Sequence, residues 1–83
     1  MQLTVISPDK SVFEGDADSL VAPAFDGEVG ILPRHAPFMT LLGKGKLVVR
    51  QGENTHSFEV SGGFLQVVDN NVRVVTEKSE GGS

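Results

Sequence analysis

The chain has 83 residues, a net charge of −4, seven basic side chains and no cysteine, tryptophan or tyrosine. This length fits one domain with a small core, and a chain without cysteine has no disulfide and no thiolate metal site. The few basic residues argue against a nucleic-acid surface and a polybasic membrane anchor. We expect a soluble protein without direct lipid insertion, because no apolar run approaches the ~20 residues of a membrane-spanning helix and the start carries no basic leader.

Taken in order, the sequence alternates apolar and polar residues in short segments, which is the pattern of β-strands. The expected strands are 3–7, 11–14, 18–25, 28–32, 38–42, 46–51, 55–61, 64–68 and 72–77. Turn residues lie between most of them, at 7–10, 26–27, 43–45, 52–54 and 69–71. Gly62 and Gly63 indicate a bulge or the close approach of another backbone. The predicted fold is all-β, a flattened sandwich or barrel of about ten short strands.

One domain over residues 1–77 is expected, followed by a flexible polar tail at 78–83. Period-2 alternation assigns one face of each strand to the core. The predicted core residues are Leu3, Val5, Phe13, Leu20, Ile31, Val48, Phe58, Val60, Phe64, Val72 and Val74.

The segment 27–37 differs from the rest of the chain. It places two glycines, two prolines, a carboxylate, an arginine and a histidine within eleven residues. Glycine permits positive φ, whereas proline fixes φ and removes a hydrogen-bond donor. The apolar residues Val29, Ile31 and Leu32 are unusual for a free connection, so we expect a stiff functional loop here.

The sequence gives little support for catalysis, and no cofactor or metal is predicted. Acidic residues that could pair as general acid and base lie near turns, where such residues commonly make local hydrogen bonds; they are Asp16, Asp18, Asp26 and Glu28. His35 and His56 have no recognised metal-ligand spacing. Ser61-Gly62-Gly63 only faintly resembles a nucleophile turn, and the lysines at 44 and 46 are interpreted as part of a solvated turn rather than a phosphate loop.

A partner-binding surface is the more promising interpretation. Leu65, Val67 and Val75 fall on the strand face opposite to the predicted core set. Apolar residues on both faces indicate either a covering layer or an exposed interface. A stand-alone sandwich that binds a peptide or small ligand, and a small hydrolase using His35 with Asp26 or Glu28, stay open as alternatives.

The residues also resemble a known family. Positions 26–37 read Asp-Gly-Glu-Val-Gly-Ile-Leu-Pro-Arg-His-Ala-Pro, and 61–67 read Ser-Gly-Gly-Phe-Leu-Gln-Val. Both stretches, together with Phe38-Met39-Thr40-Leu41-Leu42 and the closing 71–75, resemble the epsilon subunit of F-type ATP synthases. The similarity extends over about residues 3–77.

This resemblance implies a flattened ten-stranded sandwich on the central stalk of the enzyme. It implies a non-catalytic rotor subunit that binds the gamma subunit and the membrane c-ring and couples proton flow to ATP synthesis, at the cytoplasmic face of the bacterial plasma membrane. Carried over by position, the c-ring-facing residues are Gly27, Glu28, Val29 and Gly30. The gamma-facing residues are His35, Thr40 and Ser61.

Two departures from the family pattern have consequences. Arg34 stands where the family has glycine, so a positive φ there would cost about 1 kcal/mol or more. The family commonly continues into a C-terminal helical hairpin, which is missing from this sequence. The sequence fits either a naturally short subunit or a fragment of a longer one, and in both cases we expect no inhibitory extension and no nucleotide site in it.

Overall fold

The structure is a computed structural model that describes residues 1–34 and 36–81, without the side chains of residues 80 and 81. The described residues form eight β-strands and no helix, which confirms the all-β prediction. Accordingly, no helix in this part of the chain could span a membrane. The strands are β1 (Gln2–Ser7), β2 (Lys10–Asp16), β3 (Ser19–Ala24), β4 (Gly27–Ile31), β5 (Phe38–Leu41), β6 (Lys44–Gln51), β7 (Asn54–Val68) and β8 (Asn71–Gly81).

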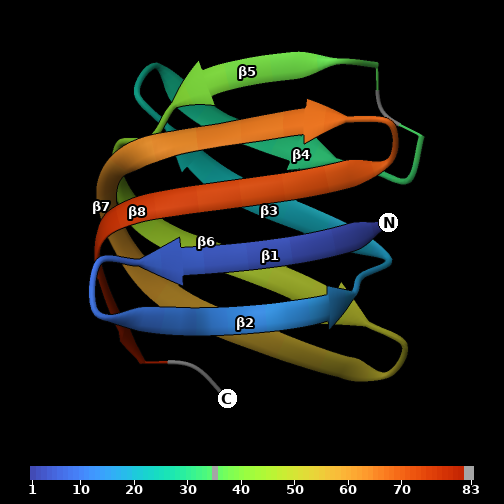
Figure 1. Ribbon diagram of the computed structural model, residues 1–83, viewed down its shortest axis with the longest axis horizontal. Helices are drawn as coiled ribbons and strands as arrows, with labels where there is room; N and C mark the ends of the chain where they lie inside the picture. The colour runs from blue at the N-terminus through green and yellow to red at the C-terminus, as the bar shows by residue number, and fades with distance from the viewer. Residues whose placement is uncertain (35, 82–83) are drawn as a thin grey trace.

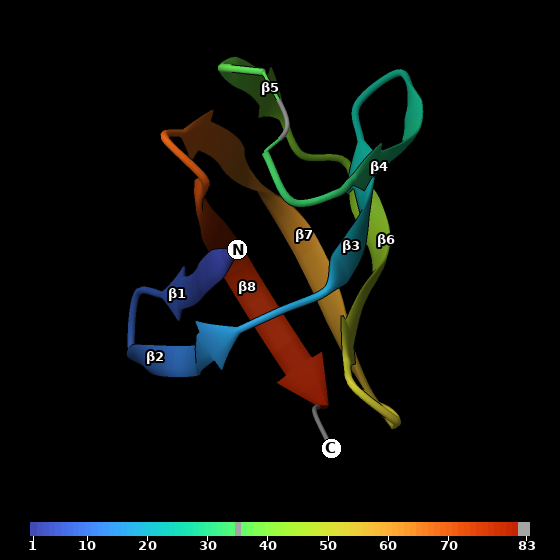
Figure 2. The same cartoon turned by 90° about the vertical axis from the view of Figure 1, so that its right-hand side faces the viewer.

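The strands pack as two layers. Figure 1 shows β5, β7, β8, β1 and β2 side by side in front, with β4, β3 and β6 behind them. In the turned view of Figure 2, β1 and β2 lie on one side, β3, β4 and β6 on the other, and β7 and β8 between them. The long strands β7 and β8 therefore connect the two layers.

A bent three-stranded ribbon makes this connection. β5 and β6 follow each other along the same side of β7 in one unbroken register, from Phe38 opposite Val67 to Gln51 opposite Asn54. Between them, the Leu42 amide donates to the Gly63 carbonyl and the Gly62 amide donates to the Gly43 carbonyl. The turn predicted at 43–45 is therefore wrong, because the chain continues along β7 instead of reversing.

The strand count follows from the same ribbon. β7 has 15 residues and β8 has 11, and each contributes one half to each layer. The sequence predicted 55–61 and 64–68 as separate strands, whereas the structure joins them through Gly62 and Gly63. Eight continuous strands thus supply the roughly ten strand segments expected of the sandwich.

The bend changes which residues of β7 face the core. Phe58 and Val60 are buried before it, whereas Leu65 and Val67 are buried after it. The predicted positions of Leu65 and Val67 on the opposite face are therefore wrong, and Phe64 lies outside the core, half-exposed. Val75 does face outward, half-exposed, as predicted.

A second wrong prediction concerns which residues of β6 face the core. Leu47 and Val49 are fully buried, whereas the predicted core residue Val48 is half-exposed. The register explains this, because Leu47 lies opposite the buried Phe58 and opposed residues share a sheet face. Phe13 is half-buried and packs against the core rather than within it. The predicted core residues that are buried are Leu3, Val5, Leu20, Ile31, Phe58, Val60, Val72 and Val74.

Close backbone packing sets the bend. Gly63 has a φ of 101°, and a Cβ atom placed there would lie 1.8 Å from the Val75 carbonyl oxygen. Opposite it, the buried Thr76 hydroxyl donates to the Lys78 carbonyl at 2.8 Å and accepts from the Ser61 amide at 3.3 Å. Glycine and threonine thus allow the two backbones to bend together without leaving these polar groups unpaired.

The end of the described chain belongs to the ribbon. Residues 78–81, expected as the start of a flexible tail, continue β8 and pair with Phe58–Ser61 of β7. The last two residues of the expected tail lie outside the described residues.

Candidate partner-binding surfaces

The proposed c-ring contact lies on a strand at the end of the sheet. Gly27, Glu28, Val29 and Gly30 belong to β4, which pairs with β3 from Leu20 opposite Ile31 to Ala24 opposite Gly27. Glu28 is exposed, while Val29 is half-buried and packs against the core. The predicted stiff loop is therefore a strand in its first half, and its ladder of hydrogen bonds holds Glu28 in place.

In the second half of this segment, the described residues 32–34 and 36–37 form no strand, and Arg34 contacts the β7–β8 turn. The Arg34 amide donates to Asn70 Oδ1 at 2.8 Å, and Arg34 has a φ of 65°. Arg34 thus occupies the left-handed conformation suited to glycine. Leu32 is 64% exposed beside it. His35 was predicted as a gamma-facing residue and lies outside the described residues.

Thr40 and Ser61, the two other predicted gamma-facing residues, lie on different sides of the sheet. Thr40 on β5 is opposite the buried Leu65, so its side chain points to the inner side of the front layer. Ser61 precedes the bend and lies on the outer side of the other layer, between Lys44 of β6 and Lys78 of β8. The structure places both beside the bend without bringing them onto one face.

An apolar row crosses the outer side of the front layer. Leu41 lies opposite Phe64, Phe64 opposite Val75, and Val75 opposite Ile6, so these four side chains share one sheet face. We call Ile6, Leu41, Phe64 and Val75 the outer row. Leu41 is 61% exposed and the other three are half-exposed.

Further apolar side chains extend the outer row. Met39, two residues before Leu41, is 60% exposed, and Val68 is 45% exposed on the same sheet face. The Phe25 amide donates to the Leu41 carbonyl at 3.0 Å, which places the 67% exposed Phe25 next to the row. Contiguous apolar surface of this kind marks interaction sites on small proteins. In the sequence, the prediction that Val75 faces away from the core was the one indication of this row.

The acidic residues considered for catalysis have local roles or stand free in solvent. Asp16 forms an ion pair with the amino group of Met1 at 3.2 Å. Asp18 Oδ2 accepts from the Gly52 amide at 2.7 Å and so attaches the β6–β7 turn to the start of β3. His56 is half-buried against the Phe13 ring, with ring centroids 5.3 Å apart. Among the described residues, no three side chains of metal-ligating type come together.

Comparisons with known proteins identify a family. The family model described as ATP synthase, Delta/Epsilon chain, beta-sandwich domain matches residues 1–82. The ATP synthase epsilon chain of Leptospira borgpetersenii is 46% identical over 77 residues, which are 93% of this chain and 61% of that relative. The epsilon chain of Nitratidesulfovibrio vulgaris is 42% identical over 80 residues, 96% of this chain and 60% of that relative. The chain thus spans about 60% of the length of these curated relatives.

Solved structures show the same fold. A chain of the Euglena gracilis mitochondrial ATP synthase, from a structure containing OSCP, F1 and the c-ring, matches with a TM-score of 0.88 and 26% identity. That match covers 95% of this chain and 51% of the other. A chain from the central stalk and c-ring of the Tetrahymena thermophila enzyme matches with a TM-score of 0.83 and 18% identity, over 96% of this chain and 65% of the other.

Proposed function

This chain belongs to the delta/epsilon chain family of ATP synthase through its β-sandwich domain, and on that premise we propose that it is a non-catalytic subunit of the central stalk. In this role it links the gamma subunit to the membrane c-ring and couples proton flow to ATP synthesis without performing chemistry itself. It is a peripheral component of the complex at the cytoplasmic face of the bacterial plasma membrane, and its own work requires no cofactor.

The outer row is the observation that carries this proposal. A rotor subunit must hold its neighbour firmly, and the interior of a stable protein interface is apolar. Leu41 and Met39 are both about 60% exposed on the edge strand β5, so a partner can cover them without rearranging the sandwich. The neighbouring Phe25 offers a large aromatic side chain, a type enriched in interface cores.

We assign the gamma subunit to the surface around the bend. Thr40 lies on β5 between the exposed Met39 and Leu41, and Ser61 lies just before the bend. One partner that wraps the outside of the bend would contact Ser61 and the two neighbours of Thr40, whose own side chain points inward. His35 is part of the same proposal by its position in the family motif.

The c-ring contact is proposed at Gly27, Glu28, Val29 and Gly30. β4 ends the strand order of the sheet, and Glu28 is exposed on it. Gly27 and Gly30 have no side chains, and nothing lies within 4 Å of where their Cβ atoms would be. A polar loop can therefore approach the backbone of β4 and the Glu28 carboxylate. The β3–β4 pairing resists the sideways load that a rotating contact transmits.

Binding to the gamma subunit of the same organism tests the proposal. We expect stable binding, and we expect Leu41→Asp to weaken it at least tenfold, because a charge would be buried in an apolar contact. The exposed position should keep the free energy of unfolding within about 0.5 kcal/mol. Val21→Asp, on the outer side of the other layer and 37% exposed, serves as the control and should bind normally.

Each contrary result has a distinct meaning. Normal binding by Leu41→Asp would remove the outer row from the interface. A wild-type chain that does not bind gamma would contradict the stalk function and favour a stand-alone binding module. For the c-ring contact, Glu28→Lys should reduce ATP-driven proton pumping in the reassembled complex, and unchanged pumping would contradict that assignment.

A further inference from the structure

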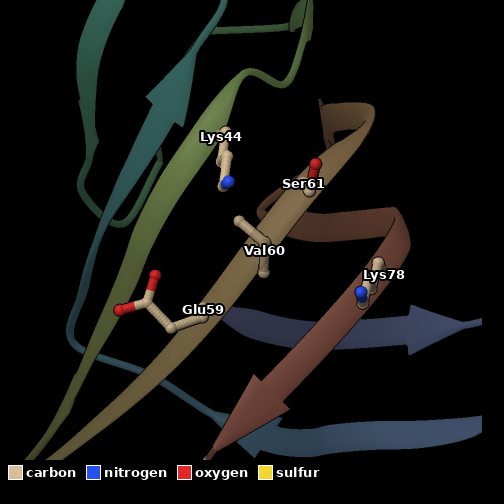
Figure 3. A pocket seen from close by; sticks show the side chains of 5 residues that line it. All are labelled: Lys44, Glu59, Val60, Ser61 and Lys78. Atoms are coloured by element: carbon tan, nitrogen blue, oxygen red, sulfur yellow. The ribbon is translucent and has the colours of Figure 1, made fainter.

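The hollow on the outer side of the bend has a lining of mixed charge. Figure 3 shows the side chains around this space of about 390 Å³, which are Lys44, Glu59, Val60, Ser61 and Lys78. The Glu77 carboxylate lies over Gly62, next to Ser61, since a Cβ atom placed on Gly62 would lie 2.8 Å from Glu77 Oε2. Groups of both charges thus surround Ser61, and the hollow favours neither an anion nor a cation.

Arg34, away from the bend, is held in a strained conformation by one side chain. Its φ of 65° lies in the left-handed region, which residues with a Cβ atom rarely adopt. Such strain persists where the surrounding structure holds it. Here the Arg34 amide donates to Asn70 Oδ1 at 2.8 Å, so the Asn70 side chain attaches the chain that follows β4 to the β7–β8 turn.

Asn70 is itself fixed on two sides. Asp69 and Asn70 both have positive φ and form the two-residue turn between the paired residues Val68 and Asn71. The Asn70 carbonyl also accepts from the Gln2 amide at 3.1 Å, which ties it to the start of β1. The Asn70 side chain therefore extends from a backbone that the sheet already holds in place.

Leu32 lies between two fixed points of the chain. On one side, the buried Ile31 pairs with Leu20 of β3. On the other side, Pro33 has a fixed φ and restricts the conformation of the residue before it, and Arg34 is bonded to Asn70. Leu32 is nevertheless 64% exposed, so a large apolar side chain is presented to solvent on a restrained backbone.

The bond to Asn70 places this segment next to the surface proposed to bind gamma. Val68 lies two residues before Asn70 and is 45% exposed on the same sheet face as the outer row. Figure 1 shows the chain after β4 beside the β7–β8 turn, at the end of the front layer. A partner that covers the outer row up to Val68 would therefore meet Leu32 just beyond the turn.

We propose that Asn70 is a positioning residue that presents Leu32 to the gamma subunit. This inference rests on the proposed function, and it adds one contact to that surface together with the residue that holds it. An apolar side chain on a restrained backbone loses less conformational freedom when it binds, so its contact strengthens the complex more. Without the Asn70 side chain, Arg34 would be free to leave the left-handed region and Leu32 would occupy many positions.

Amide hydrogen exchange in the isolated chain tests the bond itself. Asn70→Gly removes the acceptor but keeps the positive φ of the turn, and it should speed the exchange of the Arg34 amide about fivefold. Asn70→Asp retains an oxygen at this position and should keep the exchange slow. Asp69→Gly is the matched control, because Asp69 belongs to the same turn and its side chain makes no hydrogen bond in the described part of the chain.

A double-mutant cycle tests the positioning of Leu32. Leu32→Ala should weaken gamma binding about fivefold and leave the urea midpoint unchanged, since the side chain is exposed. Asn70→Gly should weaken gamma binding about threefold, whereas Asp69→Gly should change it by less than about twofold. In the Asn70→Gly background, Leu32→Ala should add less than about a twofold loss, because the two residues act through the same contact.

The outcomes separate this inference from the function on which it rests. If Asn70→Gly leaves the exchange of the Arg34 amide unchanged, Asn70 does not hold the segment and the inference fails. If the wild-type chain binds gamma but the losses from Leu32→Ala and Asn70→Gly simply multiply, or Leu32→Ala has no effect, Asn70 does not position Leu32 while the stalk function stands. If the wild-type chain does not bind gamma, the stalk function fails and the positioning role fails with it.

Discussion

Replacing Gly63 with alanine should remove a large part of the stability of this domain. The added Cβ would lie 1.8 Å from the Val75 carbonyl oxygen and 2.8 Å from the Thr76 Cα. Both atoms belong to the backbone of β8, so no side chain can turn away to relieve the clash. The φ of 101° is also a conformation that residues with a side chain rarely adopt.

The expected cost follows from these two effects. Forcing an L-residue into such a conformation costs about 1–2 kcal/mol. Moving β8 away from Gly63 also disturbs the hydrogen bonds of Thr76, each of which contributes about 1 kcal/mol or more when buried. We expect a total loss of about 3–5 kcal/mol, out of a stability of about 4–12 kcal/mol for a chain of this length.

Urea unfolding followed by far-ultraviolet circular dichroism measures the effect, since the chain has no tryptophan or tyrosine to report by fluorescence. Gly52→Ala is the control, because its φ is 61° but nothing lies within 4 Å of the new Cβ. It should lose about 1 kcal/mol from backbone strain alone. A Gly63→Ala variant within about 1 kcal/mol of Gly52→Ala would refute the close-packed bend.

Three further changes test other parts of the structure. Arg34→Gly should raise stability by about 0.5–1 kcal/mol and the melting temperature by a few degrees, because it relieves the left-handed strain; Arg34→Ala should not. Thr76→Val should cost about 2 kcal/mol in urea unfolding, because it leaves buried amide and carbonyl groups without their partner, whereas Thr76→Ser should retain most of the stability. Leu47→Ala should cost about 2–5 kcal/mol and Val48→Ala less than about 1 kcal/mol; the reverse order would mean that β6 faces the core with Val48.

Turn chemistry in the sequence correctly located the two hairpin turns at 52–54 and 69–71, although the turn predicted at 43–45 is wrong. Asp69 and Asn70 have φ values of 49° and 62°, as expected for Asx residues in a two-residue hairpin turn. Gly52 provides the positive φ of the β6–β7 turn. These signals are local, because the conformation of two residues decides each of them.

The sequence could not show which residues of β7 face the core after the bend. Phe64 continues the alternation of Phe58 and Val60, so it was assigned to the core, and Leu65 is equally apolar. The choice between them depends on whether the strand keeps its alternation through Gly62 and Gly63. That depends on the packing of Gly63 against Val75 and Thr76, which is a contact between distant parts of the chain.

The same bend explains why the predicted partner residues separate in space. Thr40 lies on β5 opposite Leu65 of β7, and Ser61 lies on β7 opposite Lys44 of β6, on the other side of the bend. Because the side-chain phase changes between them, Thr40 turns inward while Ser61 turns outward. The family motif singled out this region of the chain, and the structure shows that Leu41 and Phe64 are outward-facing members of it.

The bend therefore links stability to binding in this domain. The outer row lies on one side of it, across β5, β7, β8 and β1, and Ser61 lies on the other side with its neighbours on β6 and β8. A change that straightens the ribbon would alter the angle between these two surfaces even where the rest of the sandwich stays folded. Substitutions at Thr76 should consequently weaken partner binding at temperatures below melting, whereas an exposed change on β2, at the far edge of the front layer, should leave binding unchanged.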